Sequence, residues 1–170
     1  MENNSVSEKS LKERILRIID KNSKLSVQEL SVMLGNTEQE VAAAVSEMEA
    51  DQTICGYTTL INWEKVDNEK ITALIEVKVT PQRGQGFDVI AERIYKFSEV
   101  EAVYLMSGGF DLTVIVKGNS MREVAGFVSA KLAPMEAVLS TATHFVLKKY
   151  KEHGIAMETE QIDERMLVTP

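Results

Sequence analysis

The second half of the chain alternates segments typical of strands and helices, and the order of these segments constrains the fold more than any other feature. Residues 71–79 read ITALIEVKV, in which every second residue is apolar, the period of a strand with one buried face. The glycine-containing stretch SGGFD, residues 107–111, predicts a tight turn between two further strands. Strands are expected over residues 71–79, 100–106, 112–117 and 138–150, and helices over residues 87–97 and 120–132.

This strand-helix-strand-strand-helix-strand order is that of a ferredoxin-like domain, in which both helices cover one face of a four-stranded sheet. The opposite face is then left uncovered by the chain's own helices. The residues expected on that face include Leu74, Tyr104, Thr113 and Ile115. A small domain with a partly apolar, uncovered sheet usually packs against a second copy of itself, so the pattern predicts a homodimer.

The first sixty residues predict three short helices, of which the first runs over residues 10–21. Ser26 is followed three residues later by Glu29, and Thr37 by Glu40. This is the spacing of a capping box, in which each side chain bonds to the backbone of the other residue. The second and third helices are therefore expected to begin at these two positions.

Gly35 can close the second helix in the left-handed conformation, which makes the break before the third helix short. Two helices joined in this way fit a helix-turn-helix, and the β-rich stretch TICGYTTLI, residues 53–61, suits a wing. A three-helix bundle with no nucleic-acid role is the alternative. We expect an α+β protein with a winged helix-turn-helix at residues 1–61, a linker at 62–70, a ferredoxin-like domain at 71–152 and a tail at 153–170.

The charge of the chain is unevenly spread. The 170 residues carry a net charge of −7, and an acidic total usually counts against nucleic-acid binding. Residues 9–24, however, hold six basic and two acidic residues, whereas residues 25–63 hold six acidic residues and no Lys or Arg. Such asymmetry can mark a binding surface, although solvated helix faces explain most charge runs.

Several classes of function lack the residues they need. The chain has a single cysteine, Cys55, which excludes an internal disulfide. With only two histidines in addition, it has too few of the usual ligands for a structural zinc site, so no metal is expected. There is no phosphate-binding glycine motif and no serine or cysteine paired with a base, so we expect no cofactor, no catalytic residue and no enzyme. The longest apolar runs are too short to cross a membrane, and the start MENNSVSEKS has no signal-peptide core, so a cytoplasmic protein is expected.

The turn at residues 107–111 is the best candidate for a small-molecule site. Two adjacent glycines expose backbone N–H groups that can hold a carboxylate, and Asp111 can accept hydrogen bonds from an ammonium group. Together these groups suit the two charged ends of a free amino acid. The alternative is a hairpin turn in which the aspartate is only a cap.

The whole chain, from about Leu11 to Tyr150, resembles the Lrp/AsnC family, the leucine-responsive or feast/famine transcriptional regulators. The resemblance is carried by LKERILRIIDKNSKLSVQELSVMLG, ICGYTTLIN, SGGFDLTVIV and VLSTATHFVLKKYKEHG. It implies a DNA-binding domain, a second domain for ligand sensing and oligomerisation, an amino acid or related metabolite as effector, and dimers that often assemble into octamers. By position, the ligand-binding residues that it implies are Gly108, Gly109, Phe110, Asp111, Thr141 and Thr143.

The third helix departs from the family pattern, because alanines and glutamates stand where arginines or lysines are usual. Its Gln39 and Ser46 can still contact bases, and Thr37 with the helix N-terminus can offer donors to a phosphate. The residues of the basic stretch expected to contact phosphates are Lys12, Arg14, Arg17 and Lys24.

Three hypotheses follow. The first is a DNA-binding transcriptional regulator whose oligomeric state and DNA binding respond to an amino acid or related metabolite. The second is a ligand-sensing oligomer that has lost direct DNA binding, as the acidic third helix suggests. The third and weakest is an enzyme, since relatives of this architecture include siroheme decarboxylases.

Overall fold

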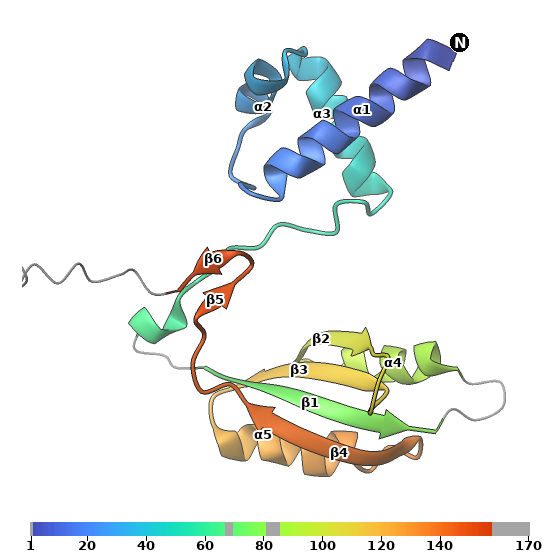
Figure 1. Cartoon of the computed structure of the whole chain (residues 1–170), viewed down its shortest axis with the longest axis vertical. Coiled ribbons are helices and arrows are strands. Elements are labelled where there is room, and N and C mark those ends of the chain that lie inside the picture. Colours follow the sequence, from blue (N-terminus) through green and yellow to red (C-terminus); the bar gives the residue numbers. More distant parts are fainter. Residues whose placement is uncertain (1, 67–69, 81–85, 158–170) are drawn as a thin grey trace, which may run out of the picture. The chain divides into compact units, whose positions relative to one another are not determined.

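The computed structural model describes residues 2–66, 70–80 and 86–157 (Figure 1). Most of the expected tail at 153–170 and the middle of the expected linker at 62–70 therefore lie outside the described residues. The chain divides into two compact units, Met1–Leu60 and Ile61–Pro170.

The first unit contains helices α1 (Glu2–Ile19), α2 (Val27–Leu34) and α3 (Glu38–Ala50). Both predicted capping boxes are confirmed, with Ser26 preceding α2 and Thr37 preceding α3. Gly35 follows α2 at φ +68°, the left-handed region that its lack of a Cβ permits. The buried core of this unit consists of Ile15, Leu30, Leu34, Val41, Ala44 and Met48.

One expectation for this unit is wrong, and the stretch expected as a wing contains no strand. Helix α1 begins at Glu2 and not near residue 10. Residues 53–61 form no strand, although their composition is β-rich. A strand exists only where a neighbouring backbone supplies ladder hydrogen bonds, and the described part of this stretch makes one local backbone bond instead, from Ile54 N–H to Met48 O at 2.8 Å.

The second unit contains the predicted ferredoxin-like order. Its strands are β1 (Ile71–Val79), β2 (Val100–Leu105), β3 (Leu112–Gly118) and β4 (Val138–Phe145), and its helices are η1 (Trp63–Lys65), α4 (Phe87–Tyr95), α5 (Met121–Phe127) and η2 (Val128–Leu132). The sheet is antiparallel in the order β2-β3-β1-β4. The helix expected to run unbroken to Leu132 instead changes at Val128 into the π-helical turn η2.

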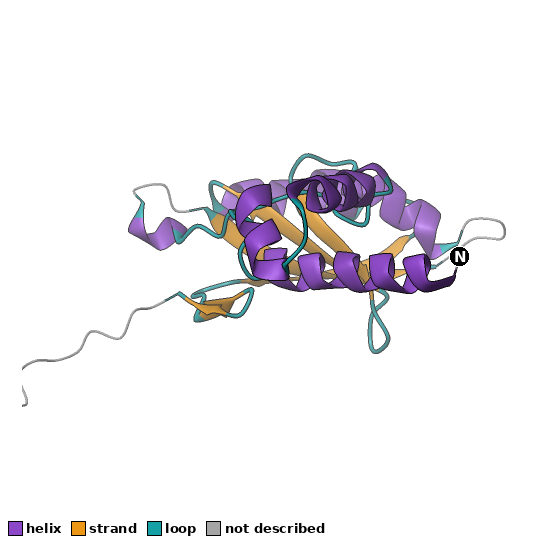
Figure 2. Cartoon of the chain, turned by 90° about the horizontal axis from the view of Figure 1, so that it is seen from above, coloured by secondary structure: helices purple, strands orange, loops and turns teal. Residues whose placement is uncertain are grey.

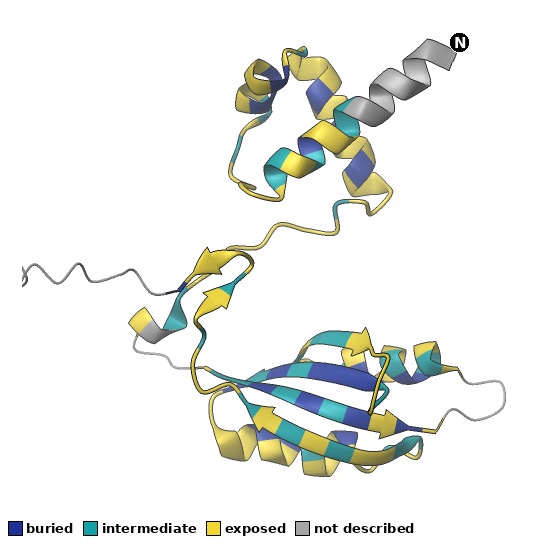
Figure 3. Ribbon diagram, viewed as in Figure 1, coloured by how far each residue is buried: buried dark blue, intermediate teal, exposed yellow. Residues whose placement is uncertain are grey.

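Helices α4 and α5 pack on the same face of the sheet. Ile90 and Ile94 of α4, with Val124 and Phe127 of α5, share one core with the alternate buried residues of β1 and β3 (Figure 3). The rings of Phe97 and Phe127 pack edge to face, with their centroids 5.6 Å apart. This packing confirms the two-layer arrangement that the order of strands and helices predicts.

The strand register places the expected residues on the opposite face. Leu74 is opposite Ile115, and Thr113 is opposite Tyr104. Tyr104 is 56% exposed, whereas Thr113, on a central strand, is buried. The central strands thus carry apolar side chains on the face that α4 and α5 do not cover.

The last predicted strand, over residues 138–150, is too long. Strand β4 ends at Phe145, opposite Ala73, because β1 begins two residues earlier and offers little further backbone to pair with. The chain then forms a separate hairpin from β5 (Lys151–Glu152) and β6 (Ile155–Ala156), which Figures 1 and 2 draw apart from the main sheet. His153 and Gly154, at φ +47° and +79°, make its turn.

Candidate functional site

The exposed face of α3 is a neutral stripe of small side chains. It consists of Gln39, Ala42, Ala43, Ser46 and Ala50, which recur at three- and four-residue spacing and are all exposed. The opposite side of α3, with Val41, Ala44 and Met48, is buried in the core of the unit. Helical geometry therefore brings the two predicted base-contact residues, Gln39 and Ser46, to one face two turns apart.

Three of the four glutamates of α3 have partners within the same unit. Glu40 accepts from the Thr37 N–H at 2.9 Å, Glu47 pairs with Lys12 Nζ at 3.0 Å, and Glu49 accepts from Tyr57 Oη at 2.8 Å. The backbone and hydroxyl donors of Thr37 hold the pKa of Glu40 below its usual value, and the hydrogen bond to Glu49 raises the pKa of Tyr57. Each of these three carboxylates therefore already has a donor before any DNA is bound.

The basic residues expected to contact phosphates also have partners. Lys12 pairs with Glu47, Arg17 Nη2 lies 2.6 Å from Glu13 Oε1, and Arg14 Nη2 donates to Leu34 O at 2.5 Å. Arg14 thereby satisfies a carbonyl at the C-terminal end of α2, where helix carbonyls lack intrahelical partners. Phosphate contact by Lys12 or Arg14 would compete with these bonds, whereas the Arg17 pair is highly exposed and easily exchanged.

Two further predicted DNA contacts lie at the ends of loops. Lys24 is exposed before α2. Thr37 uses its hydroxyl in the capping box, where it accepts from the Glu40 N–H at 3.3 Å. Its backbone N–H is also bonded to Glu40, so a phosphate at the start of α3 would have to replace that carboxylate.

The predicted ligand turn joins β2 and β3. Gly108 has φ +153°, a conformation that side chains rarely adopt, and Ser107 through Gly109 are exposed. Asp111 Oδ2 accepts from the Val79 N–H at 2.8 Å, and the Asp111 N–H donates to Val77 O at 3.1 Å. The aspartate therefore fastens the turn to the end of β1, a role that the sequence alternative of a capping aspartate anticipates.

Thr141 lies at the same end of the sheet as this turn, and Thr143 lies farther from it. Thr141 is opposite Val77 and Thr143 is opposite Ile75, both on the face that carries the helices. Because β1 separates β3 from β4, Thr141 is about 10 Å from β3 across two strand spacings. Phe110 is partly buried beside Asp111. The assignment of these residues to a ligand remains a prediction.

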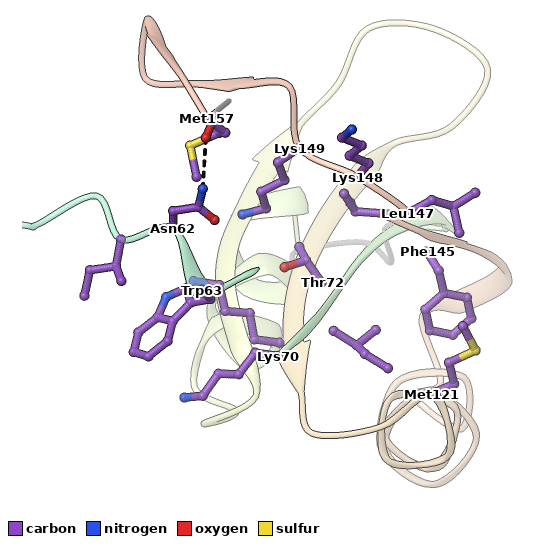
Figure 4. Close-up of a pocket in the computed structure, with 14 residues that line it drawn as sticks. Asn62, Trp63, Lys70, Thr72, Met121, Phe145, Leu147, Lys148, Lys149 and Met157 are labelled. Carbon is purple, nitrogen blue, oxygen red and sulfur yellow. Dashed lines mark hydrogen bonds between the residues drawn. The ribbon is translucent and has the colours of Figure 1, made fainter. Parts of the chain in front are cut away.

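A cavity of about 570 Å³ was not anticipated from the sequence. It lies at the opposite end of the sheet from the turn, and its lining includes Trp63, Lys117 and Lys149 (Figure 4). The run LKKYK at 147–151 was the available signal. The lysines that face the cavity come from segments far apart in the sequence, so the run alone did not reveal it.

Two other features are absent from the described residues, a cluster of metal ligands and a membrane-spanning helix. No group of three or more His, Cys, Asp or Glu side chains that could hold a metal ion occurs there. None of the helices in the described ranges combines the length and apolar character needed to cross a membrane.

Two family models match the chain. The model described as the Lrp/AsnC ligand binding domain matches residues 72–156, and that described as winged helix-turn-helix DNA-binding matches residues 9–54. The HTH-type transcriptional regulator YugG of Bacillus subtilis is 50% identical over 157 residues, which cover 92% of this chain and 95% of that protein. A proline dehydrogenase transcriptional activator of Rhizobium radiobacter is 25% identical, over 84% of this chain and 90% of its own.

Solved structures share the fold. A transcriptional regulator from Neisseria meningitidis, determined as a complex with L-Met, matches with a TM-score of 0.67 at 22% identity, covering 84% of this chain and 91% of its own. Escherichia coli AsnC matches with a TM-score of 0.64 at 17% identity, covering 84% of this chain and 94% of its own.

Proposed function

The chain belongs to the Lrp/AsnC family of transcriptional regulators, and from this premise we propose that it binds DNA through α3 and changes its assembly and DNA affinity when an amino acid or related metabolite binds. The observation that supports DNA binding most directly is the neutral stripe on α3, beside which three of the helix's four glutamates already have donors. Such a regulator acts in the cytoplasm, which is the localisation we propose.

The stripe suits a particular kind of base contact. Ala42 and Ala43 present methyl groups of the kind that contact the methyl of thymine, and Gln39 can bond adenine through two hydrogen bonds. No arginine is available on α3 for the paired contact to guanine. We therefore expect a site in which adenine and thymine dominate the positions read by α3.

The effector is proposed to bind at the turn of Gly108 to Asp111. The exposed glycines offer N–H groups for a carboxylate, and Asp111 Oδ1 can receive an ammonium group while Oδ2 remains bonded to Val79. The L-Met complex of the Neisseria regulator supports an amino acid as the class of ligand. Ligand at this turn would alter contacts between copies of the chain and so the spacing of paired DNA-binding units.

The uncovered sheet face is proposed to form the dimer. Leu74 and Ile115 give it an apolar centre, and His144 Nε2 lies 3.3 Å from Glu76 Oε1 beside them. Replacing Ile115 with glutamate is expected to convert the dimer to a monomer in analytical ultracentrifugation, while Ala125→Glu, at an exposed position of α5 on the other side of the sheet, is the matched control. Dimers that persist in Ile115→Glu would place the interface elsewhere.

The experiment that tests the function is a footprint on the DNA upstream of the chain's own gene. We expect protection of a discrete site, with A·T-rich positions at its centre, and a change in the footprint when one member of a panel of amino acids is added. Ligand binding without any footprint would favour the alternative of a regulator that has lost DNA binding. The enzyme alternative gains no support from the relatives reported above, which are named as regulators.

A further inference from the structure

The cavity at the start of β1 has a basic and partly apolar lining. Its walls come from η1, the first residues of β1, the end of β3, the start of α5 and the chain after β4. Figure 4 shows Trp63 on one side of Thr72, with Phe145 and Met121 on the other. Four lysines line it, and no carboxylate is found among the described lining residues.

Two of these lysines are held in place by carboxylates outside the cavity. Lys117 Nζ lies 2.5 Å from Glu101 Oε1, and Lys149 Nζ lies 2.8 Å from Glu152 Oε1. Their side chains are only 31% and 27% exposed. An ammonium group has three donors, so one carboxylate fixes its position and leaves capacity for a second anion. Partial burial strengthens the attraction relative to that of an exposed lysine.

The apolar part of the lining sets a second requirement. The Lys70 ammonium lies 5.6 Å from the centre of the Trp63 ring, and the Phe145 ring is partly buried beside β1. These groups offer flat apolar surface next to positive charge. We propose that this cavity binds a small amphipathic anion, in which a carboxylate or phosphate meets the lysines and an aromatic or aliphatic body packs against Trp63 and Phe145.

This site is separate from the effector turn. Thr72 lines the cavity, whereas Val79, seven residues along β1, is bonded to Asp111, so the two sites are about 23 Å apart at 3.3 Å per residue. The described lining also offers no carboxylate to receive the ammonium group of a free amino acid. The proposal therefore adds a second ligand class and does not depend on the proposed effector at the turn.

The test uses the full chain and its single tryptophan, Trp63, as the reporter. Three probes are titrated: 3-phenylpropionate, phenyl phosphate and the uncharged 3-phenylpropanamide. We expect saturable changes in Trp63 fluorescence with both anions and binding of the amide that is weaker by about tenfold or more, the value of a charge-assisted hydrogen bond. The anion that binds with the higher affinity shows whether the lysines prefer a carboxylate or a phosphate. Equal binding of the amide, or no saturable change, would overturn the proposal.

Variants locate the bound probe. Lys149→Gln is expected to weaken the tighter anion about tenfold, and Lys149→Arg to retain most of the affinity, because one charge-assisted contact is lost or kept. Lys151→Gln is the matched control, because Lys151 is exposed two residues away and does not line the cavity. Lys117→Gln provides a second test outside the β5–β6 hairpin. Wild-type affinity in both glutamine variants would overturn the proposal.

Two further measurements separate this site from others. Asp111→Asn should leave probe binding unchanged, and a loss there would mean that the probe occupies the turn. Duplex DNA of random sequence should not displace the probe. Displacement that weakens steeply with added salt would show instead that the lysines form a phosphate-contact surface for DNA.

Discussion

The α3 surface and the Gly108–Asp111 turn use acidic side chains in opposite ways. Beside α3, Glu40, Glu47 and Glu49 accept from donors of their own unit, which leaves a neutral stripe between them. At the turn, the bond from the Val79 N–H to Asp111 Oδ2 fixes a carboxylate where a ligand can reach it. Bonds within the chain thus occupy the carboxylates beside α3, whereas at the turn such a bond holds the carboxylate of Asp111 in position for a ligand. The net charge of the chain, −7, therefore does not indicate the local charge of either surface.

The largest expected effect comes from placing a charge in the stripe. Ala43→Glu should weaken binding to the upstream DNA by at least about 100-fold, because like charges at an interface cost several kcal/mol. Ala43→Ser, equally exposed and neutral, should stay close to wild type. Fluorescence anisotropy with labelled duplex measures both, and wild-type affinity of Ala43→Glu would show that α3 does not enter the groove.

The turn is tested by two replacements of the same aspartate. Asp111→Ala and Asp111→Asn should each weaken the effector about tenfold or more, because both remove the charge that receives the ammonium group. Only Asp111→Ala should also lower the free energy of unfolding, by about 1 kcal/mol, since asparagine keeps an acceptor for the Val79 N–H. Calorimetric titration and denaturant unfolding separate these effects. A normal effector response in Asp111→Asn would refute the assigned role of the charge.

The two arginines of α1 should divide into one that contacts DNA and one that supports the fold. Arg17→Ala is expected to weaken all DNA sequences by a few-fold and to reduce the salt slope by about 0.9, the value for one phosphate contact. Lys96→Ala is the control, because Lys96, directly after α4, forms the same kind of i,i+4 pair with Glu92. An unchanged salt slope in Arg17→Ala would exclude that contact.

Arg14→Ala should act through stability. Loss of its bond to Leu34 O is expected to lower the free energy of unfolding of the first unit by about 1 kcal/mol. Denaturant unfolding followed by helical circular dichroism measures this change. A reduced salt slope without destabilisation would instead assign Arg14 to a phosphate.

The smallest effect concerns pH. The backbone and hydroxyl of Thr37 lower the pKa of Glu40, so its contribution to stability is present above the ordinary glutamate pKa and is lost as pH falls from about 4.5 through the lowered value. Glu40→Gln should reduce this acid sensitivity of the first unit, whereas Glu38→Gln, in the same helical turn but outside the box, should retain it. Identical acid unfolding curves for Glu40→Gln and wild type would contradict this account.

Features that depend on neighbouring residues were predictable from the sequence. The two capping boxes, Gly35 and the bounds of β1 were all anticipated, because each follows from side-chain spacing or backbone freedom within a few residues. The end of β4 was not, because it depends on where the partner strand β1 begins. The absence of a strand in residues 53–61 was not predictable for the same reason, since this β-rich stretch has no partner strand within the described residues of the first unit.

The candidate sites were predictable only in part. Gln39 and Ser46 on one face of α3 follow from helical periodicity, but the bonds of Lys12 and Arg14 join different helices and required the structure. The lysine-lined cavity combines Trp63 with residues more than fifty positions away, such as Lys117. Such tertiary assembly has no local sequence pattern.

The central claim is that a regulator with no positive charge on α3 still binds DNA and that an amino acid controls this binding. A salt titration of affinity for the DNA upstream of its own gene, with and without a panel of amino acids, tests it most directly. We expect salt-sensitive binding with a shallow slope, set by few phosphate contacts, and a change in affinity with one amino acid that Asp111→Asn removes. Binding that is absent at every salt concentration, with or without the panel, would contradict the account.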